Sequence, residues 1–217
     1  MKEKLVIIGS GGHGKKMLEL SEENNFNLIG FLSNQDKGTK INNYKILGYL
    51  EEYLNEDIFI DCNYHIAIGN NFIRFEIDNK LKNKKTSKNL ISKKSILSKD
   101  LKIGMGCSIN HGAIIQVSVE IGNSVIIDSG CIIEHDCKIG NYVNIHPGSI
   151  LCGNVEIMDN SIIGSGSIIR EKVKIGKNSL IGAGSLVLND IPDNVIAYGK
   201  PAKIISTNRK FSDKYLK

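Results

Sequence analysis

The residues best suited to chemistry lie in the segment 132–140, which reads IIEHDCKIG. His135 is followed directly by Asp136. A histidine titrates near neutral pH and can take a proton from a hydroxyl or an amine. A neighbouring carboxylate can fix the tautomer of the ring and raise its basicity. The pair therefore predicts a general base at His135 that is assisted by Asp136.

A second candidate is the segment GSGGHGK near the start of the chain, where Gly9, Gly11 and Gly14 have the spacing of a dinucleotide-binding turn. Glycines allow the tight turn, and the N-terminus of the following helix presents amide hydrogens to an anion. An NAD site also needs an acidic residue at the end of the next strand, where this chain has Ser33 and Asn34. The segment therefore predicts binding of a phosphate group, with NAD and a purely structural turn as alternatives.

The elements that would hold these residues have two different periods. Every sixth residue from Ile91 to Val187 is Ile, Leu or Val, and the residue four places after each is usually small or β-branched. A helix cannot produce this period, because positions six apart on a helix lie on nearly opposite faces. Units of six residues cannot bury their own apolar side chains, so they must wind and stack into a solenoid of short strands.

The residues before the repeat alternate between strand and helix patterns. Apolar strands are expected at Leu5–Ile8, Leu28–Leu32 and Ile66–Ile68, and amphipathic helices at Lys15–Glu23 and Phe72–Leu81. Strand, glycine turn, helix and strand in this order predict a parallel sheet, here a reduced Rossmann-like α/β unit. We expect this domain to span residues 1–84 and the solenoid, with a C-terminal tail, to span residues 85–217.

The repeat resembles the hexapeptide-repeat family, whose members form a left-handed triangular β-helix with three hexapeptides per coil. The resemblance implies that residues eighteen apart stack at about 4.8 Å. Gly153 would then lie one coil from His135, where its N–H could hold a thioester carbonyl as charge develops. Ser165 and Ala183 would form a second column, along which a pantetheine arm could lie. The alternatives are a corner glycine at Gly153 and simple corner packing at Ser165 and Ala183.

The segments GSGGHGK, GFLSN and AIGNNFIR, followed by the repeat, together resemble the bacterial sugar acetyltransferases of the sialic-acid O-acetyltransferase type. This family includes the N-acetyltransferases that modify nucleotide-linked 4-amino-4,6-dideoxy sugars. The resemblance covers nearly the whole chain. It implies an N-terminal domain that binds a nucleotide sugar, a β-helix that binds acetyl-CoA as co-substrate, and a homotrimer with sites between neighbouring chains.

The resemblance also implies site residues, motif by motif. It assigns the base to His135, the partner carboxylate to Asp136 and the thioester donor to Gly153, and it places coenzyme A along Ser165 and Ala183. The implied substrate-binding residues are Gly11, Gly12, His13, Ser33, Asn34 and Gly69. The segment GKPAK, residues 199–203, resembles the family's exit from the helix near the adenine end of the cofactor.

Two departures from the family pattern affect the expected contacts. Relatives often carry Asp-Asp where this chain has Ser33 and Asn34, which concerns contacts to the ribose or the base. Relatives often carry a histidine that touches acetyl-CoA where this chain has Asn144. Asn144 therefore stays a candidate cofactor-binding residue, and His146, two residues further on, is a possible substitute.

The predicted reaction moves the acetyl group of acetyl-CoA to the amine of a nucleotide-linked 4-amino-4,6-dideoxy sugar in bacterial surface-glycan biosynthesis. The alternative is O-acetylation of a sialic acid or its nucleotide conjugate, because the nucleophile belongs to the substrate. A solenoid that only binds coenzyme A is a more remote alternative. A gamma-type carbonic anhydrase needs three histidines on zinc, whereas coil arithmetic places His111, His135 and His146 on different edges or heights.

The composition fits a cytoplasmic globular protein. The 217 residues are 41% hydrophobic and 24% charged, and the net charge is +5. The five cysteines form no CxxC pair, so neither a disulfide framework nor a metal site is expected. The lysines are scattered without interleaved aromatic residues, so no nucleic-acid partner is expected. No apolar run is long enough for membrane insertion.

Overall fold

The computed structural model describes residues 2–55, 61–81 and 87–207. The chain divides into two compact units, Met1–Lys93 and Lys94–Lys217. The expected boundary between residues 84 and 85 lies outside the described residues, so it stays a prediction.

The first unit is built on a five-stranded sheet in the order β3-β4-β2-β1-β5. Only β3 is antiparallel to its neighbour, β4. The strands are β1 (Lys4–Ile8), β2 (Asn27–Leu32), β3 (Lys40–Ile41), β4 (Tyr44–Gly48) and β5 (Cys62–Ile66), and β6 (Leu90–Ile91) follows. The helices are α1 (Gly12–Glu23), α2 (Leu50–Asn55) and α3 (Asn71–Leu81). None of these helices is long and apolar enough to span a membrane.

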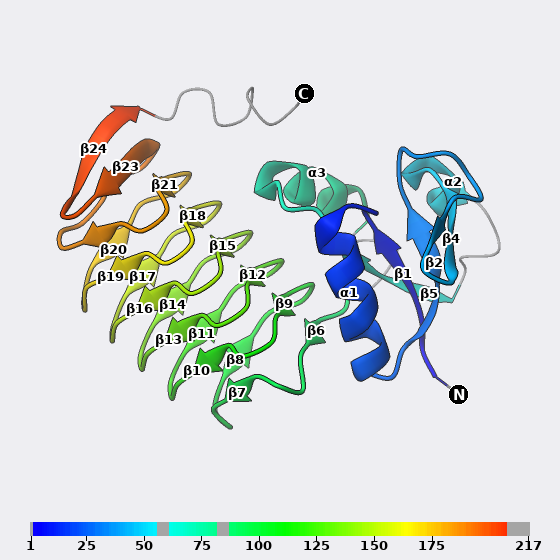
Figure 1. Cartoon of the computed structure of the whole chain (residues 1–217), viewed down its shortest axis with the longest axis horizontal. Coiled ribbons are helices and arrows are strands. Elements are labelled where there is room, and N and C mark those ends of the chain that lie inside the picture. Colours follow the sequence, from blue (N-terminus) through cyan, green and yellow to red (C-terminus); the bar gives the residue numbers. More distant parts are fainter. Residues whose placement is uncertain (1, 56–60, 82–86, 208–217) are drawn as a thin grey trace. The chain divides into compact units, whose positions relative to one another are not determined.

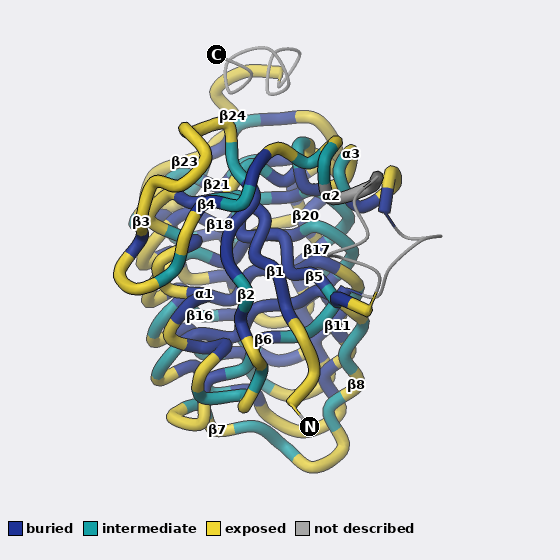
Figure 2. The backbone as a smooth tube through the Cα atoms, turned by 90° about the vertical axis from the view of Figure 1, so that its right-hand side faces the viewer, coloured by how far each residue is buried: buried dark blue, intermediate teal, exposed yellow. Residues whose placement is uncertain are grey.

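Both faces of the sheet carry a core. Successive side chains of a strand point to opposite faces, so the apolar run of β1 needs cover on both sides. Leu5 and Ile7 pack into one cluster with Met17 of α1. Ile8 packs into the other cluster with Leu81 of α3. The inner part of β1 is accordingly buried (Figure 2), and the expected α/β class of this region is confirmed.

The third strand differs from expectation. Ile66–Ile68 was the expected strand, but β5 spans Cys62–Ile66 and ends where that segment begins. The strand was hard to predict because its sequence is largely polar, and polar residues are usually taken as exposed. Here they are buried and have hydrogen-bond partners. The hydroxyl of Tyr64 donates to Oδ1 of Asp78 at 2.7 Å, and Nδ1 of His65 donates to a backbone carbonyl at 2.8 Å.

The second unit is a left-handed parallel β-helix in which each coil adds one strand to each of three faces (Figure 1). The first face consists of β7 (Ile96–Leu97), β10 (Ile114–Ile115), β13 (Ile132–Ile133), β16 (Ile150–Leu151), β19 (Ile168–Ile169) and β22 (Leu186–Val187). The second face consists of β8 (Lys102–Ile103), β11 (Glu120–Ile121), β14 (Lys138–Ile139), β17 (Glu156–Ile157) and β20 (Lys174–Ile175).

The third face ends in a hairpin. Its short strands are β9 (Ser108–Ile109), β12 (Ile126–Ile127), β15 (Asn144–Ile145), β18 (Ile162–Ile163) and β21 (Leu180–Ile181). β23 (Val195–Gly199) pairs parallel with β21, and β24 (Ala202–Thr207) returns antiparallel beside β23.

The register of the β-helix matches the expected stacking. Ile114 pairs with Ile132, and Ile132 pairs with Ile150, so partners are eighteen residues apart. The second residue of each short strand points inward and is buried at every coil from Ile109 to Val187. The six-residue period is therefore the inward-facing period of a hexapeptide β-helix, and the predicted fold class is confirmed.

The outward positions differ between two of the faces. The first face carries an aliphatic residue at every coil, and none of them is buried: Ile96, Ile114, Ile132, Ile150, Ile168 and Leu186. The second face alternates between the two charges: Lys102, Glu120, Lys138, Glu156 and Lys174. Nζ of Lys102 lies 2.7 Å from Oε1 of Glu120, and this alternation avoids like charges on neighbouring strands. The second face thus suits solvent, whereas the first presents a continuous apolar stripe.

Candidate active site

His135 and Asp136 form a hydrogen-bonded pair at the corner that follows β13. Nδ1 of His135 lies 2.8 Å from Oδ2 of Asp136, and about half of each side chain is exposed. A carboxylate only accepts hydrogen bonds, so Nδ1 carries the proton. In the neutral ring Nε2 then keeps its lone pair and is the atom that can accept a proton. The predicted pair is thus brought together with the geometry of a general base.

A tight turn holds the pair. Asp136 has a φ of 60°, in the left-handed region that favours glycine. Its amide donates to the carbonyl of Val117, one coil earlier, at 3.1 Å. The backbone of the pair is therefore fixed by the stacking of coils, although its side chains are exposed.

Gly153 lies against the imidazole of His135. The amide of Asn154 donates to the carbonyl of His135 at 2.9 Å, which places the two segments on adjacent coils. A methyl group built on Gly153 would lie 2.6 Å from both Cε1 and Nε2 of His135, closer than real side chains approach one another. Glycine at this position thus lets the ring lie against the backbone, and a side chain here would displace it. The proposed donation of its N–H to a thioester stays a prediction.

The neighbouring thiol is poorly suited to act as a nucleophile. Cys152 precedes Gly153 on the same coil. Partial burial, and after it the charges of Glu171 and Glu134, raises the pKa of the Cys152 thiol. A thiol with a raised pKa is protonated at neutral pH and reacts slowly. An attacking atom supplied by a substrate fits this site better than an acyl-cysteine.

The predicted cofactor residues lie at two kinds of position. Ser165 and Ala183 are both exposed at the corner that follows the third face, and the amide of Gly184 donates to the carbonyl of Ser165 at 2.8 Å. Asn144 lies in β15, where it pairs in register with Ile162, and its side chain is buried. The structure therefore brings Ser165 and Ala183 into one column, as expected, and places Asn144 apart from them.

His146 is more accessible than Asn144. Its side chain is 37% exposed, and Nδ1 lies 3.4 Å from Oδ2 of Asp128, one coil earlier. The side-chain Nδ2 of Asn110, a further coil earlier, donates to the other oxygen of Asp128, Oδ1, at 3.4 Å. The sequence indicated His146 only as a substitute for Asn144, and the pairing with Asp128 shows only in the eighteen-residue register.

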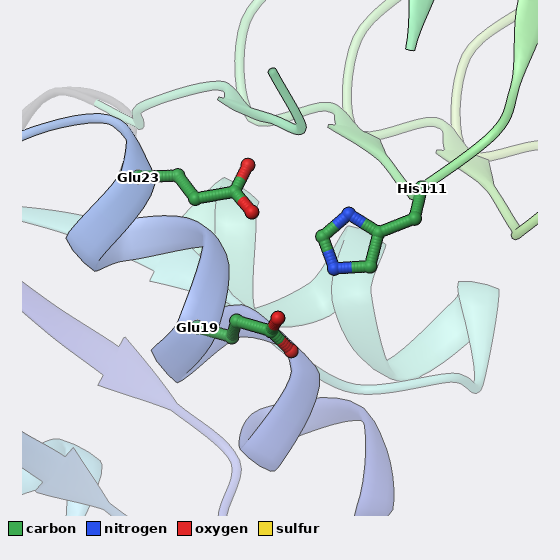
Figure 3. Close-up of side chains that lie close together, drawn as sticks. All are labelled: Glu19, Glu23 and His111. Atoms are coloured by element: carbon green, nitrogen blue, oxygen red, sulfur yellow. The ribbon is translucent and has the colours of Figure 1, made fainter. Parts of the chain in front are cut away.

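The three histidines that a zinc hydratase would need do not share one corner. His135 follows the first face, whereas His111 and His146 follow the third. Figure 3 shows His111 in the turn that follows β9, and it shows Glu19 and Glu23 one turn apart on α1. The two glutamates belong to the first unit and His111 to the second.

The first unit contains a cavity of about 390 Å³. Three of the six predicted substrate-binding residues line it: Gly11, Ser33 and Asn34. Gly12, His13 and Gly69 are not among its lining residues. Most of the remaining wall is apolar and comes from β1, β2, the turn after β5, and the two helices α2 and α3: Ile8, Leu32, Leu50, Ile68, Ile73 and Ile77. The cavity lies at the carboxyl ends of parallel strands, where α/β sheets bind ligands.

The glycines around this cavity fall into two kinds. Gly9 has a φ of +108°, and a methyl group there would lie 2.6 Å from a backbone oxygen; a methyl group on Gly14 would collide with the carbonyl of Gly9. These two are structural. At Gly11, Gly12 and Gly69 no described atom lies within 4 Å of the Cβ position, and none of the three has a positive φ. Glycine at these positions keeps the surface open to a closely approaching ligand.

A hydrogen bond joins the glycine turn to the end of β2. Oγ of Ser10 lies 2.6 Å from Oγ of Ser33. The amide of Gln35 also lies 3.3 Å from the Ser33 hydroxyl. Ser33 thus holds the turn in place, while Asn34 is exposed beside it. The departure from Asp-Asp therefore leaves an uncharged wall at this point of the cavity.

The sequence pattern missed a buried arginine next to the cavity. The expected helix from Phe72 to Leu81 exists, but its apolar residues do not all face the core: Phe72 and Phe75 are each 38% exposed. The buried residues of α3 are Asn71, Arg74, Asp78 and Leu81. These residues are spaced so that they share one face of the helix with Leu81. That spacing was the only feature of the sequence that could have indicated a buried Arg74.

Comparisons with known proteins agree with this architecture. Residues 4–81 match the model of the PglD N-terminal domain, and residues 118–153 and 154–189 match the bacterial transferase hexapeptide model. The acetyltransferase domain of PglB from Neisseria gonorrhoeae FA1090 is 30% identical, with a TM-score of 0.90; the match covers 94% of this chain and 100% of that domain. The chain belongs to the hexapeptide-repeat sugar acetyltransferases. The predicted enzyme class, an acetyl-CoA-dependent sugar acetyltransferase, is thereby confirmed.

Other sugar acetyltransferase structures are similar over nearly the same length. PerB from Caulobacter crescentus, solved in complex with CoA and GDP-perosamine, is 27% identical with a TM-score of 0.86, and the match covers 94% of this chain and 97% of PerB. WeeI from Acinetobacter baumannii AYE is 26% identical with a TM-score of 0.85, over 93% and 99%. The PglB domain has also been solved in complex with acetyl coenzyme A. No curated protein sequence matches the chain.

Proposed function

We propose that this sugar acetyltransferase moves the acetyl group of acetyl-CoA to the amine of a nucleotide-linked 4-amino-4,6-dideoxy sugar, as a cytoplasmic step of surface-glycan biosynthesis. The observation that carries the proposal is the His135–Asp136 pair seated on Gly153 in a chain of this family. The complex of PerB with CoA and GDP-perosamine supports an amino sugar as the acceptor.

The proposed step uses His135 as the base. Nε2 takes a proton from the sugar amine as its nitrogen attacks the thioester carbon, while Asp136 holds Nδ1–H and stabilises the imidazolium that forms. The negative charge that develops on the thioester oxygen is met by the N–H of Gly153. Collapse of the intermediate breaks the carbon–sulfur bond, and the proton on His135 passes to the departing thiolate. The products are the acetamido sugar and coenzyme A.

The nucleotide sugar is proposed to bind to the first unit, through Gly11, Gly12, His13, Ser33, Asn34 and Gly69. Open space at the three glycines supports close approach of the ligand, and the N-terminus of α1 favours a phosphate group. The apolar wall of the cavity fits the ring of a base. Coenzyme A is proposed to lie along Ser165 and Ala183, with Asn144 or His146 near its reactive end.

We also propose a homotrimer with active sites between neighbouring chains. The apolar stripe of the first face supports an interface between copies, because a soluble chain rarely leaves such a stripe in water. Closed cyclic symmetry lets identical chains cover it.

Incubation with acetyl-CoA and a panel of UDP-, dTDP-, GDP- and CMP-linked sugars tests the proposal. Mass spectrometry should find an N-acetylated product with one of the amino sugars. Acetylation only of sugars that lack a free amine would instead indicate an O-acetyltransferase. Binding of coenzyme A without any product would indicate a binding protein.

A further inference from the structure

Arg74 is the largest fully buried side chain among the described residues, with 1% of it exposed. It lies in the first turns of α3, and its Nη1 donates to the carbonyl of Ile68 at 2.9 Å and to the carbonyl of Gly69 at 3.1 Å. Two consecutive carbonyls of the turn between β5 and α3 thus meet one guanidinium nitrogen. The turn belongs to the ligand cavity, because Ile68 is part of its wall.

The two bonds fix the orientation of the turn. A trans peptide is planar, so fixing the direction of its carbonyl fixes the whole plane. Both peptide planes that follow Ile68 are held in this way. Gly69, which is exposed and has no side chain to restrain it, otherwise has unusual backbone freedom. Arg74 therefore supplies a conformational restraint that Gly69, without a side chain, lacks.

Stability alone does not account for an arginine at this position. Burying a guanidinium is costly, and replacing buried charges with apolar side chains of similar volume is often neutral or stabilising. The amphipathic pattern of α3 would accept Met or Leu in line with Leu81. What an apolar side chain cannot do is hold two carbonyls with charge-assisted hydrogen bonds.

We propose that Arg74 is a positioning residue for the nucleotide sugar: it holds the turn from Ile68 to Asn70 in the conformation against which the ligand binds. The inference rests on the proposed binding of a nucleotide sugar by the first unit. Arg74 lies behind the turn and acts through it, so it should affect nucleotide affinity without affecting coenzyme A.

Tyr64 provides a matched control. Its hydroxyl bonds Asp78, one turn beyond Arg74 on α3, and it is as deeply buried as Arg74. This hydroxyl bond runs to the side chain of Asp78, not to the two carbonyls that Arg74 holds. Tyr64→Phe therefore disturbs the same buried polar region without releasing the two carbonyls.

Calorimetry on the full chain tests the inference with UDP, GDP, dTDP and CMP as probes. The nucleotide that the wild-type protein binds most tightly is then titrated into Arg74→Met, Arg74→Lys and Tyr64→Phe. We expect at least a tenfold loss of affinity in Arg74→Met and a smaller loss in Arg74→Lys, whose ammonium keeps the charge but not the planar fork. Tyr64→Phe should stay within twofold of wild type, and coenzyme A affinity should stay within twofold throughout.

Three results would overturn the inference. The first is wild-type nucleotide affinity in a folded Arg74→Met protein, or in Arg74→Lys if Arg74→Met does not fold. The second is an equal loss in Tyr64→Phe, which would make Arg74 merely structural. The third is a parallel loss of coenzyme A affinity. A wild-type protein that binds none of the four nucleotides would instead refute the proposed function, and the inference with it.

Discussion

The proposed base His135 has two neighbours that shape its site, and its own ring is partly exposed. Asp136 fixes the proton on Nδ1, Gly153 leaves room for the ring, and the exposed half of the imidazole stays accessible to a substrate. Neither Asp136, which is exposed, nor Gly153, which is buried but has no side chain, contributes an apolar side chain to the core. Losses at this site should therefore appear in the rate of reaction before they appear in the stability of the fold.

Removing the imidazole should slow the reaction. His135→Ala is expected to lower turnover by roughly 10² to 10⁴-fold, because general acid–base catalysis contributes about that much. Binding of both substrates should be nearly unchanged, since the base acts in the transition state. Steady-state kinetics on the assembled variant measures this, with Glu171→Ala, two coils away in the same column and also exposed, as a control. Wild-type turnover in His135→Ala would end the catalytic assignment.

Asp136 allows activity and stability to be separated. Its φ of 60° suits glycine, so Asp136→Gly should leave the free energy of unfolding within about 1 kcal/mol of wild type. The melting temperature should accordingly be unchanged or slightly raised. Turnover should nevertheless fall, because the ring loses the carboxylate that orients it. Thermal melts and kinetics on one preparation test both halves. A clear loss of stability together with full turnover would make Asp136 a structural residue.

At the scale of elements, the glycine-rich segment from Gly9 to Gly14, which leads into the first turn of α1, combines structural and open positions. Gly12→Val places a side chain in open space, so the protein should fold while nucleotide-sugar affinity falls by tenfold or more. Coenzyme A affinity should stay within a few-fold, because the variant leaves the β-helix intact. Gly14→Val serves as the structural comparison and should not fold, since its Cβ would meet the carbonyl of Gly9. Equal loss of both affinities in a folded Gly12→Val would contradict separate sites.

A buried histidine in β5 should make the stability of the first unit depend on pH. Burial lowers the pKa of His65 to about 4 from 6.5, and the nearby charge of Arg74 also lowers it. As the pH falls from 6.5 to 4, the unfolded chain binds a proton that the folded unit does not. Stability present above pH 6.5 should then be lost, by about 3 kcal/mol in all.

Melting curves between pH 7 and pH 4 measure this effect. His65→Gln removes the titrating group and should flatten the dependence of the melting temperature on pH. An equally steep profile in the variant would show that other groups are responsible.

The two units differ in how well their sequence predicts them. The β-helix repeats one inward position at every coil, so the period alone located nearly all of its strands. The first unit has no such redundancy. β5 was displaced because Tyr64 and His65 read as surface residues, although bonds made by distant residues allow both to be buried. Arg74 and the hairpin of β3 and β4 were missed for different reasons, although their partners are close in sequence. An arginine in a helix is usually exposed, and β3 has only two residues, too few to show an alternating pattern.

Site residues followed the same division. That His135, Asp136 and Gly153 lie together could be predicted, because the first two are adjacent in sequence and the coil period brings Gly153 beside them. The pairing of His146 with Asp128 needs the same arithmetic, but no motif draws attention to it. The hydrogen bond between Ser10 and Ser33 joins the segments that follow two neighbouring strands, β1 and β2, so only the three-dimensional structure reveals it.

At the scale of the whole molecule, the apolar stripe of the first face should decide assembly. Light scattering is expected to give three times the chain mass of 23.9 kDa. Ile150→Lys places a charge in the middle of the stripe and should dissociate the trimer and lower turnover, because the sites are proposed to lie between chains. Glu156→Lys, on the charged second face, should remain trimeric. A wild-type monomer at working concentration would refute the assembly.

Residues eighteen apart stack on neighbouring coils, so the separation of stacked residues in the second unit is set by the spacing between strands. His135 and Gly153 lie one coil apart, as do Ser165 and Ala183. A one-residue insertion between such pairs would move every later side chain off its face, whereas a whole added coil would preserve all columns and lengthen the edge by about 4.8 Å. Distances along each edge of the β-helix can therefore change only in whole steps. Fine adjustment of reactivity is left to the identity of the corner residues and to the length of the substrate.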